Sequence, residues 1–462
     1  MDHPAARIMS ILTHLDKRRP LALAAVVLTS LAAVLAGTGL GLLSNMDRWC
    51  WDFNHVLAGR RHDPSSTLIV SLDAQALAAY PNTPLAFWGP QYAKAIERLK
   101  MAGAASIALD VLLGITPEQW LRTLGADNIP EALLDYDQGF DQALAQGRVV
   151  LAARPVRDKG AIPVPFPARE YLDALPGKLE NLGLTNLHRD SDNVVRLMVA
   201  AYAGVQSAPN TADFPVPEGY AAPDPWWTLG VLAVREAGLL GKAAFSDALA
   251  GRSPEPIAFC GPPGTIPRLS LAALTREEGL SNDEQALIAG RVVFIGAEFE
   301  GAGDRLPTPY SRRFLWLGHR DMSGVEIHAN IAETVINPGR LGTVPLWLAG
   351  LLWLPFLAGA ALVCDRSSPW KGKGAKAALI GAGWALGLVF FLAGKLLPVA
   401  GLITGLGMVF TSVSGLRMTR AERERARIAR LLDRQASGKA AGCNEGCGSE
   451  ARPVRNGGRR KP

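Results

Sequence analysis

Cysteine is scarce in this sequence, with five residues in 462, and charged side chains make up only 19% of it. Five cysteines are too few for a fold held together by disulfide bonds. The sequence also lacks the GxSxG elbow of serine esterases, the HExxH zinc motif and the Walker phosphate loop. These absences exclude a small disulfide-rich domain, and we expect no catalytic residue, no cofactor and no bound metal.

Two of the cysteines, Cys50 and Cys260, fall in the long polar part of the sequence between residues 44 and 344. A bridge between them is compatible with an oxidising compartment. Two separate buried thiols are the simpler interpretation, and the sequence leaves both open.

Long apolar runs are the most prominent feature that the sequence does contain. Hydrophobic residues make up 48% of it and the mean hydropathy is +0.13. About 20 consecutive apolar residues cross the hydrocarbon core of a bilayer as a helix. The first run is longer than the apolar core of a cleaved signal peptide, which spans about 7–15 residues, so we expect an uncleaved anchor. Four runs predict transmembrane helices: Leu21–Leu43, Pro345–Cys364, Ala377–Gly394 and Leu396–Leu416.

Lysine and arginine near these runs predict which side of the membrane each loop occupies, because short cytoplasmic loops are enriched in them. Basic residues precede the first run, fill the loop after the second and follow the fourth: Lys17, Arg18, Arg19, Arg366, Lys371, Lys373, Lys376 and Arg417. We therefore expect a bacterial inner-membrane protein with residues 1–20 and 417–462 in the cytoplasm. Residues 21–43 form the anchor, 44–344 a periplasmic domain and 345–416 a three-helix bundle. This topology accounts for most of the net charge of +6 without a nucleic-acid partner.

The central region alternates between short apolar runs and stretches with helical spacing. Strands are predicted at Leu68–Asp73, Ser106–Leu113, Arg148–Ala153 and Arg291–Ala297, and helices at Pro90–Met101, Pro130–Gln146 and Gly324–Ile336. Continuous apolar strands between helices are typical of an α/β domain with a mostly parallel sheet and helices on both faces. Two proline-rich stretches, Pro155–Pro167 and Ser207–Pro225, are predicted to be surface loops.

Candidate ligand-binding residues follow the predicted strands, because ligands of open α/β sheets bind beyond the carboxyl ends of the strands. They are Asp73, Asp110, Glu298, Asp304 in the turn GAGD, and Glu326 and His328 in GVEIHAN. If they converge, they form a polar pocket for a cationic ligand, a hydrogen-bonding small molecule or a divalent metal. A structural interpretation competes with this one, since an Asp after a strand often caps the next helix. Residues two apart, such as Glu326 and His328, also do not share a helical face.

Several blocks of the sequence resemble the second class of CHASE domains, the cyclase/histidine-kinase-associated sensory extracellular domains. The similar blocks are Trp51–Arg61, Leu68–Tyr80, Ala93–Leu113, Gly183–Met198, Arg291–Ser311 and Met322–Ile336. The resemblance covers about Met46 to Leu341 and includes the three apolar runs that follow. It implies an extracytoplasmic sensory domain that passes a signal through the membrane, in receptors that are often dimers. Ala74 departs from the family pattern, which has a second acid at that place.

The segment after Leu416 is short, with 46 residues, and leaves no room for a catalytic output domain. Arg417–Gln435 is predicted to be a basic helix, and the chain from Ala436 onward to be disordered. We therefore expect a non-enzymatic sensor that relays its signal to a separate effector protein. The basic helix is equally compatible with binding to anionic membrane lipid. Three other hypotheses stay open: a non-sensing structural or recruiting envelope protein, a remnant receptor without output, and a periplasmic metal-assisted hydrolase using Asp73, Asp110, Asp304 and His328.

Overall fold

The computed structural model describes residues 4–125, 135–154, 166–202, 217–239, 254–314, 317–367 and 369–444. The described chain forms two compact units. One contains residues 1–44, 345–386 and 398–462, and the other contains residues 45–344 and 387–397. Both predicted proline-rich loops, and the first half of the helix predicted at Pro130–Gln146, lie largely outside the described residues.

The first unit is built from long helices: α1 (Pro4–Gly39), α14 (Leu346–Arg366), α15 (Pro369–Leu392, whose last six residues belong to the second unit) and α16 (Val399–Asn444). Each contains a segment long and apolar enough to cross a membrane, Arg19–Gly39, Leu346–Arg366, Gly372–Leu392 and Val399–Leu432. A helix of about 20 residues is about 30 Å long, which matches the hydrocarbon core. The prediction of four membrane-crossing helices is thus supported by length and composition.

Small residues allow α1, α14 and α16 to pack closely. Gly401 lies against the indole of Trp353, and Gly405 lies against Leu357 and Val34. Such small residues let transmembrane helices approach one another. At one end of this bundle Arg19 and Asp365 form an ion pair of 2.7 Å.

The last helix is longer than the sequence predicted. α16 continues past Ala436 to Asn444, so the expectation of disorder from Ala436 onward is wrong for its first nine residues. Alanine, arginine, glutamate and leucine dominate the segment after Leu416, and these residues have high helix propensity.

A six-stranded parallel sheet forms the centre of the second unit. Its strands are β1 (Thr67–Leu72), β2 (Ser106–Asp110), β3 (Val149–Ala153), β4 (Leu182–Leu184), β9 (Arg268–Ser270) and β10 (Val292–Ala297). They lie in the order β4-β3-β2-β10-β1-β9, and every neighbouring pair is parallel. All six residues of β1 are buried, as expected for a strand covered on both faces.

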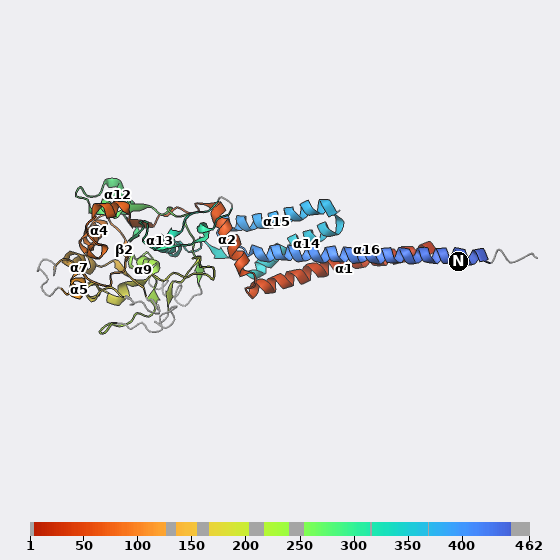
Figure 1. Ribbon diagram of the computed structural model, residues 1–462, viewed down its shortest axis with the longest axis horizontal. Coiled ribbons are helices and arrows are strands. Elements are labelled where there is room, and N and C mark those ends of the chain that lie inside the picture. The colour runs from red at the N-terminus through yellow and green to blue at the C-terminus, as the bar shows by residue number, and fades with distance from the viewer. Residues whose placement is uncertain are drawn as a thin grey trace, which may run out of the picture. The chain divides into compact units, whose positions relative to one another are not determined.

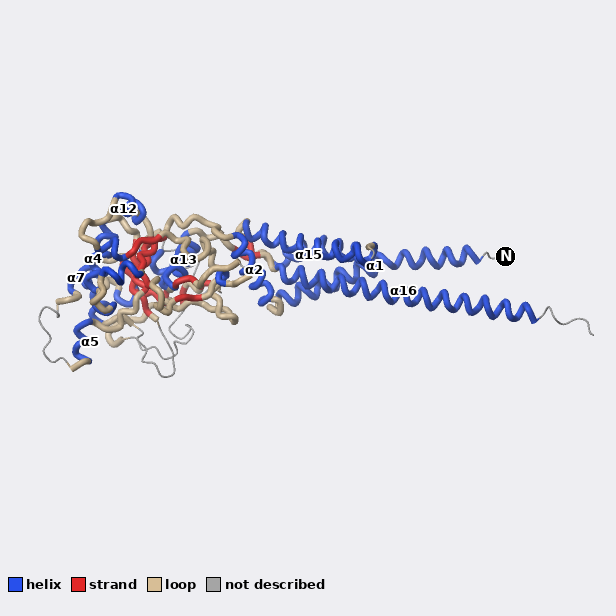
Figure 2. The backbone as a smooth tube through the Cα atoms, turned by 45° about the horizontal axis from the view of Figure 1, so that its top comes forward, coloured by secondary structure: helices blue, strands red, loops and turns tan. Residues whose placement is uncertain are grey.

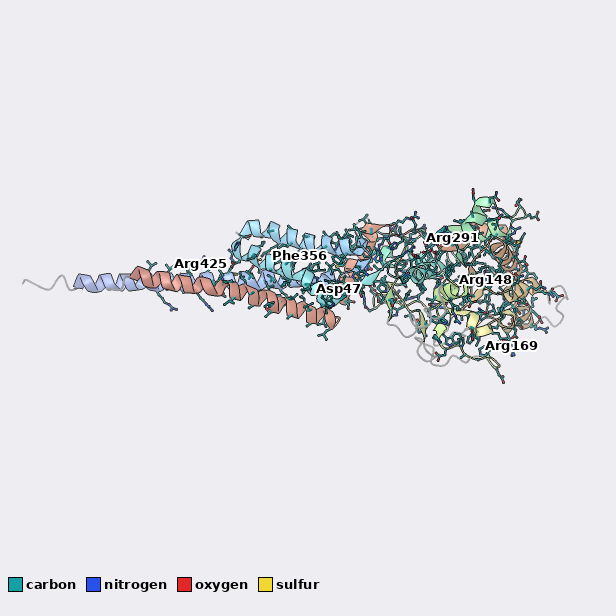
Figure 3. All side chains as sticks on the ribbon, turned by 180° about the vertical axis from the view of Figure 1, so that it is seen from behind. Asp47, Arg148, Arg169, Arg291, Phe356 and Arg425 are labelled. Carbon is teal, nitrogen blue, oxygen red and sulfur yellow. The ribbon has the colours of Figure 1, made fainter. Side chains whose placement is uncertain are left out.

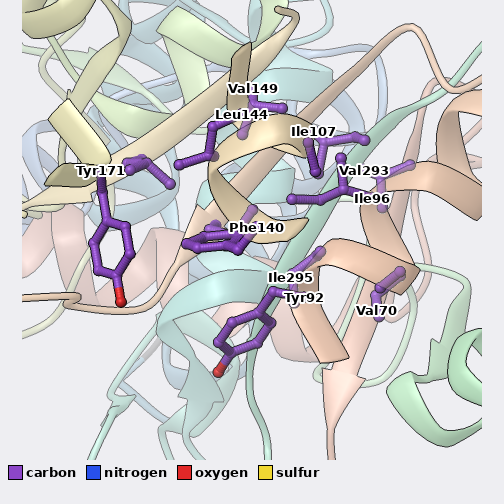
Figure 4. Close-up of a cluster of buried hydrophobic side chains, with 14 of the residues drawn as sticks. Val70, Tyr92, Ile96, Ile107, Phe140, Leu144, Val149, Tyr171, Val293 and Ile295 are labelled. Atoms are coloured by element: carbon purple, nitrogen blue, oxygen red, sulfur yellow. The ribbon is translucent and has the colours of Figure 1, made fainter. Parts of the chain in front are cut away.

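Helices cover both faces of the sheet, which confirms the α/β prediction (Figures 1 and 2). Val70 and Ile107 point to the face that carries α4 (Gly89–Met101) and α7 (Gln138–Ala145), where Phe140 and Tyr92 fill the core (Figure 4). Ile69 and Ala108 point to the opposite face, which carries α9 (Leu229–Glu236) and α13 (Gly324–Ile336). Adjacent residues of a strand point to opposite faces, so one apolar run supplies both cores.

Shorter elements complete the second unit. Its other helices are α2 (Ser44–Ala58), α3 (Ala74–Ala79), α5 (Pro117–Thr123), α8 (Arg169–Ala174), α11 (Leu271–Thr275) and α12 (Asn282–Ile288). Two-residue strands pair as β5 (Leu197–Met198) with β8 (Glu255–Pro256), β6 (Ala201–Tyr202) with β7 (Trp226–Trp227), β11 (Arg305–Leu306) with β12 (Met322–Ser323), and β13 (Gly342–Thr343) with β14 (Lys395–Leu396). Cys50 and Cys260 are free thiols, so the structure contains no bridge between them.

Candidate functional site

A cavity of about 910 Å³ opens at the carboxyl ends of five neighbouring strands. Each strand contributes its last residue or the residue that follows it: Leu72, Asp110, Arg154, Thr185 and Ala297. Parallel strands end at the same edge of a sheet, so residues far apart in the sequence meet there. The volume lies within the range of small-molecule binding sites.

Two of the predicted site residues, Asp110 and Asp304, face this cavity as a pair of acids. Burial and the nearby Asp304 together raise the pKa of Asp110 to about 7, against the lowering effect of Arg154. Burial also raises the pKa of Asp304, against the lowering effects of Arg154 and Arg189. Two carboxyl groups that share a poorly solvated site resist being charged together, so burial in this cavity disfavours two carboxylates.

Glycines place Asp304 at the cavity. In the turn GAGD, Gly301 and Gly303 have φ angles of +92° and +71°, a conformation that side-chain-bearing residues rarely adopt. A Cβ atom at Gly324, the first residue of α13, would collide with the Asp304 carboxylate. The glycine-rich turn and the glycine at the helix start therefore both fix the position of this acid.

His328 is the third predicted site residue that lines the cavity. It lies on α13 with 1% of its surface exposed, and burial lowers its pKa to about 4, so the ring is neutral at pH 7. Its Nδ1 atom has no hydrogen-bond partner within the described chain, and the same is true of Tyr92 Oη and Thr185 Oγ1. Buried polar atoms without partners cost free energy, and a ligand that enters the cavity can satisfy them.

The other three predicted site residues have structural partners instead. Asp73 caps α3 by accepting a hydrogen bond from the Ala76 N–H (2.9 Å) and another from the Ser270 hydroxyl (2.7 Å). Glu298 pairs with Arg268 (2.8 Å). Glu326 accepts hydrogen bonds from the backbone N–H of Gly264 (2.9 Å). The structure therefore brings together Asp110, Asp304 and His328 but not all six residues, because local caps and turns engage the rest.

Sequence reasoning missed the basic and hydroxyl residues of the cavity. Arg154 follows β3 directly, and Thr185 follows β4, so the rule that found Asp110 also applies to them. β4 has only three residues, too few to be recognised in the sequence. Arg189 and Tyr92 carry no such positional signal, since Arg189 lies in an irregular segment and Tyr92 in the first turn of α4.

A buried ion cluster lies in the same unit and was also missed. The Arg196 guanidinium donates to Asp52 (2.7 Å), Asp190 (2.7 Å) and Asp192 (2.8 Å). Arg312 binds both Asp52 and Asp192. Burial by itself would lower the pKa of Arg196, but the hydrogen bonds to these acids outweigh burial and raise it. The hydrogen bond from Arg196 holds the pKa of Asp192 well below its usual range.

An aromatic cluster surrounds His55 on the next turn of α2. The imidazole lies edge-on to Phe391 (4.6 Å between ring centroids), Tyr310 (5.4 Å) and Phe259 (6.2 Å). Arg61 stacks over the Phe391 ring at 4.0 Å and donates to the Phe391 carbonyl oxygen at 2.8 Å. Burial and the nearby charge of Arg61 lower the pKa of His55 to about 3. Together the ion cluster and this aromatic cluster fix α2 within the second unit.

Comparison with known families decides the classification. The CHASE2 domain family matches residues 24–363, about three quarters of the chain. The chain belongs to the CHASE2 family. CHASE2 domains are sensory domains, which supports a sensing role for the cavity-bearing unit. The CHASE2 match begins earlier than the resemblance recognised in the sequence, in α1, and it ends in α14, the first of the three apolar helices that the resemblance included. Neither a curated protein nor a solved structure matches this CHASE2 chain.

The geometry of this CHASE2 unit does not assemble the residue set of the hydrolase hypothesis. That hypothesis needs Asp73 beside Asp110, Asp304 and His328, but the Asp73 carboxylate caps α3 and binds Ser270. Within the described ranges, no three His, Cys, Asp or Glu side chains are grouped in a way that could hold a metal ion. Asp73 is therefore not among the residues that line the cavity with Asp110, Asp304 and His328, and the hydrolase hypothesis stays a prediction.

Proposed function

We propose that this CHASE2 protein is a non-enzymatic membrane sensor that binds a small extracytoplasmic ligand in the strand-end cavity. The observation that carries the proposal is the buried polar chemistry of the cavity. Tyr92 Oη, Thr185 Oγ1 and His328 Nδ1 lack hydrogen-bond partners in the described chain. The negative charge of Asp304 also raises the pKa of Asp110. Such groups are costly in an empty site and favourable in an occupied one, so the site is suited to binding.

A path of direct contacts leads from the cavity to the juxtamembrane helix α2. Arg189 lines the cavity, and its neighbour Asp190 binds Arg196 in the ion cluster. Arg196 in turn holds Asp52 on α2. Residues 40–43 connect α2 to α1, which contains the first candidate membrane span. If the ion cluster has two arrangements and a ligand binds one of them more tightly, the ligand shifts the population toward that arrangement. This shift is the relay that we propose.

The proposed orientation of the protein in the membrane rests on the distribution of basic residues. Cytoplasmic loops are enriched in Lys and Arg, which supports the proposal that both termini lie inside a bacterial cell and the CHASE2 unit lies in the periplasm. The part of α16 after Leu416 is basic and exposed, as Arg425 illustrates (Figure 3). Met418, Ile428 and Leu432 are also exposed there, at 66%, 52% and 60%. We propose that this segment binds a separate effector protein, in the monomer or in a homodimer.

Cross-linked capture from native membranes tests the relay. The intact chain is compared with a chain that ends at Leu416 and therefore lacks the exposed part of α16. Recovery of an effector with the intact chain alone is the expected result. Recovery of no partner by either chain would contradict the relay and favour a structural or remnant protein.

Binding to lipid is the competing role of the basic segment. Vesicles with and without anionic lipid separate the two roles, because each Lys or Arg near an anionic surface contributes about 1 kcal/mol. If the intact chain captures an effector after reconstitution into neutral lipid, lipid binding is not the main role of the segment.

A further inference from the structure

The charges around the cavity are of both signs and come from different elements. The acid Asp110 ends β2 and the acid Asp304 follows β10, and the bases Arg154 and Arg189 follow β3 and β4. The ion pairs found within 4.0 Å in the described chain are made by other residues, for instance Arg196 with Asp52 and Arg268 with Glu298. In the described chain, neither Asp110 nor Asp304 therefore forms an ion pair with Arg154 or Arg189 within 4.0 Å.

The acid pair is suited to a cation. Asp110 and Asp304 raise the free energy of each other's charged form, and burial adds to this cost. A ligand ammonium group placed between them would stabilise both carboxylates and would donate up to three hydrogen bonds. The fixed position of Asp304, set by the glycine turn and by Gly324, gives such a group a preformed partner.

The two arginines are suited to an anion. Arg154 and Arg189 are exposed at the cavity, and the planar fork of a guanidinium matches a carboxylate. Thr185 lines the same cavity. Its hydroxyl has no hydrogen-bond partner in the described chain. Arg154, Arg189 and Thr185 therefore offer hydrogen-bond donors to the cavity, whereas ionised Asp110 and Asp304 offer acceptors.

Apolar side chains form a large part of the remaining lining. They include Leu72, Leu85, Val111, Leu187, Phe299 and Leu306. A ligand without an apolar part would leave this surface in contact with water, whereas burial of apolar area contributes about 25 cal/mol per Å².

From these three surfaces we infer that the ligand is a small zwitterion of the amino-acid or short-peptide class, with a free ammonium group, a free carboxylate and apolar side chains. The ammonium lies between Asp110 and Asp304, and the carboxylate lies against Arg154 and Arg189. This inference rests on the proposed function, because it names the ligand class of the same cavity.

Binding by the full-length protein in detergent micelles tests the ligand class. The probes are a pool of the twenty proteinogenic amino acids and a pool of unmodified dipeptides, and stabilisation by one pool distinguishes the two sources. The best single compound is then compared by calorimetry with its C-terminal amide, which keeps only the cation, and with its deaminated acid, which keeps only the anion. We expect each to bind roughly tenfold to a hundredfold more weakly, since each loses one charge-assisted contact.

Two variants connect the affinity to the named residues. Asp110→Asn should weaken the zwitterion and its amide alike, and Arg154→Gln should weaken the zwitterion but not its amide. Glu277→Gln and Arg320→Gln are the matched controls, because both side chains are exposed and neither lines the cavity. Thermal unfolding without ligand verifies that each variant is folded.

Two results would overturn the ligand class. One is an absence of stabilisation by both pools, and the other is an amide or a deaminated acid that binds as tightly as the zwitterion. If a purely cationic or anionic compound binds and Asp110→Asn or Arg154→Gln abolishes it, the cavity still senses a ligand and only the zwitterion class is wrong.

Discussion

Arg196 and Asp52 form a bidentate ion pair in which both nitrogen–oxygen distances are 2.7 Å. Their side chains are 3% and 0% exposed. Arg196 belongs to the block Gly183–Met198 that carries part of the family resemblance, and Asp52 lies on α2, next to the first candidate membrane span in sequence. A buried charge is tolerated only with a matched partner, so this pair sets where α2 lies on the CHASE2 unit.

Removal of Asp52 should destabilise the CHASE2 unit strongly. Asp52→Ala leaves Arg196 buried with one partner fewer, and breaking a buried pair in this way costs about 3–5 kcal/mol. Thermal unfolding of the detergent-solubilised chain measures the loss as a lower midpoint.

The pair between Arg122 and Glu118 is the matched control. It has the same distance of 2.7 Å, but its side chains are 59% and 35% exposed. Glu118→Ala should therefore change the midpoint little, since exposed pairs contribute about 0–1 kcal/mol. An equal decrease of the unfolding midpoint in the two variants would show that Asp52 does not anchor α2.

Asp110 should make the stability of the unliganded protein fall as the pH rises. Its folded pKa of about 7 lies above the ordinary carboxyl value of 3.8. The folded state therefore holds a proton that the unfolded state releases, and this contribution is complete below about pH 4 and lost as the pH rises through 7. Asp110→Asn removes the group whose deprotonation lowers the stability. The thermal unfolding midpoint of the variant minus that of the wild type should therefore be larger at pH 8 than at pH 5.

The groups around Asp110 do not explain the same trend. His328 is neutral throughout this pH range, and Asp304 is the acid whose charge raises the pKa of Asp110. Asp304→Asn should consequently lower the pKa of Asp110 and reduce the pH dependence without abolishing it. A difference between Asp110→Asn and wild type that stays constant from pH 5 to pH 8 would refute the raised pKa.

Phe391 should hold the end of α15 on the CHASE2 unit. It is fully buried, stacks with Arg61 and lies edge-on to His55. Truncation of a buried phenylalanine costs about 3–5 kcal/mol, so Phe391→Ala should lower the unfolding midpoint by several degrees. Val389→Ala serves as the control because Val389 is 61% exposed on the same helix. A comparable effect of both substitutions would count against this contact.

The proposed topology predicts which positions react with a membrane-impermeant maleimide in intact cells. A single cysteine at Asn82, which is exposed in the CHASE2 unit, should be labelled. A single cysteine at Arg423, which is exposed on α16, should be labelled only after the membrane is permeabilised. The reverse pattern would invert the orientation that the basic loops predict.

Sequence patterns predicted the long elements of the fold well. The predicted helix Gly324–Ile336 coincides with α13, and the predicted strand Leu68–Asp73 differs from β1 by one residue at each end. Both have strong apolar periodicity or a continuous apolar run. β4 and β9 were not recognised, because three residues give no periodicity and pairing in the sheet, not local preference, makes them strands.

The site was only partly predictable for a related reason. The positions of Asp110 and Asp304 follow from the general rule on strand ends, and that rule also selected Asp73 and Glu298. Which acids face the cavity is decided by partners distant in sequence, such as Ser270 for Asp73 and Arg268 for Glu298. A single sequence does not reveal such contacts, so the ligand-binding role of Asp110, Asp304 and His328 stays a prediction.

The most direct test of the account is whether a blocked cavity changes partner capture in native membranes. Ala302 lines the cavity, and Ala302→Trp places an indole there while leaving α2 and α16 unaltered. Quantitative cross-linked capture compares this variant with wild type and with the control Glu277→Gln. The account predicts that Ala302→Trp alone changes the amount of effector recovered, and identical recovery from all three chains would contradict it.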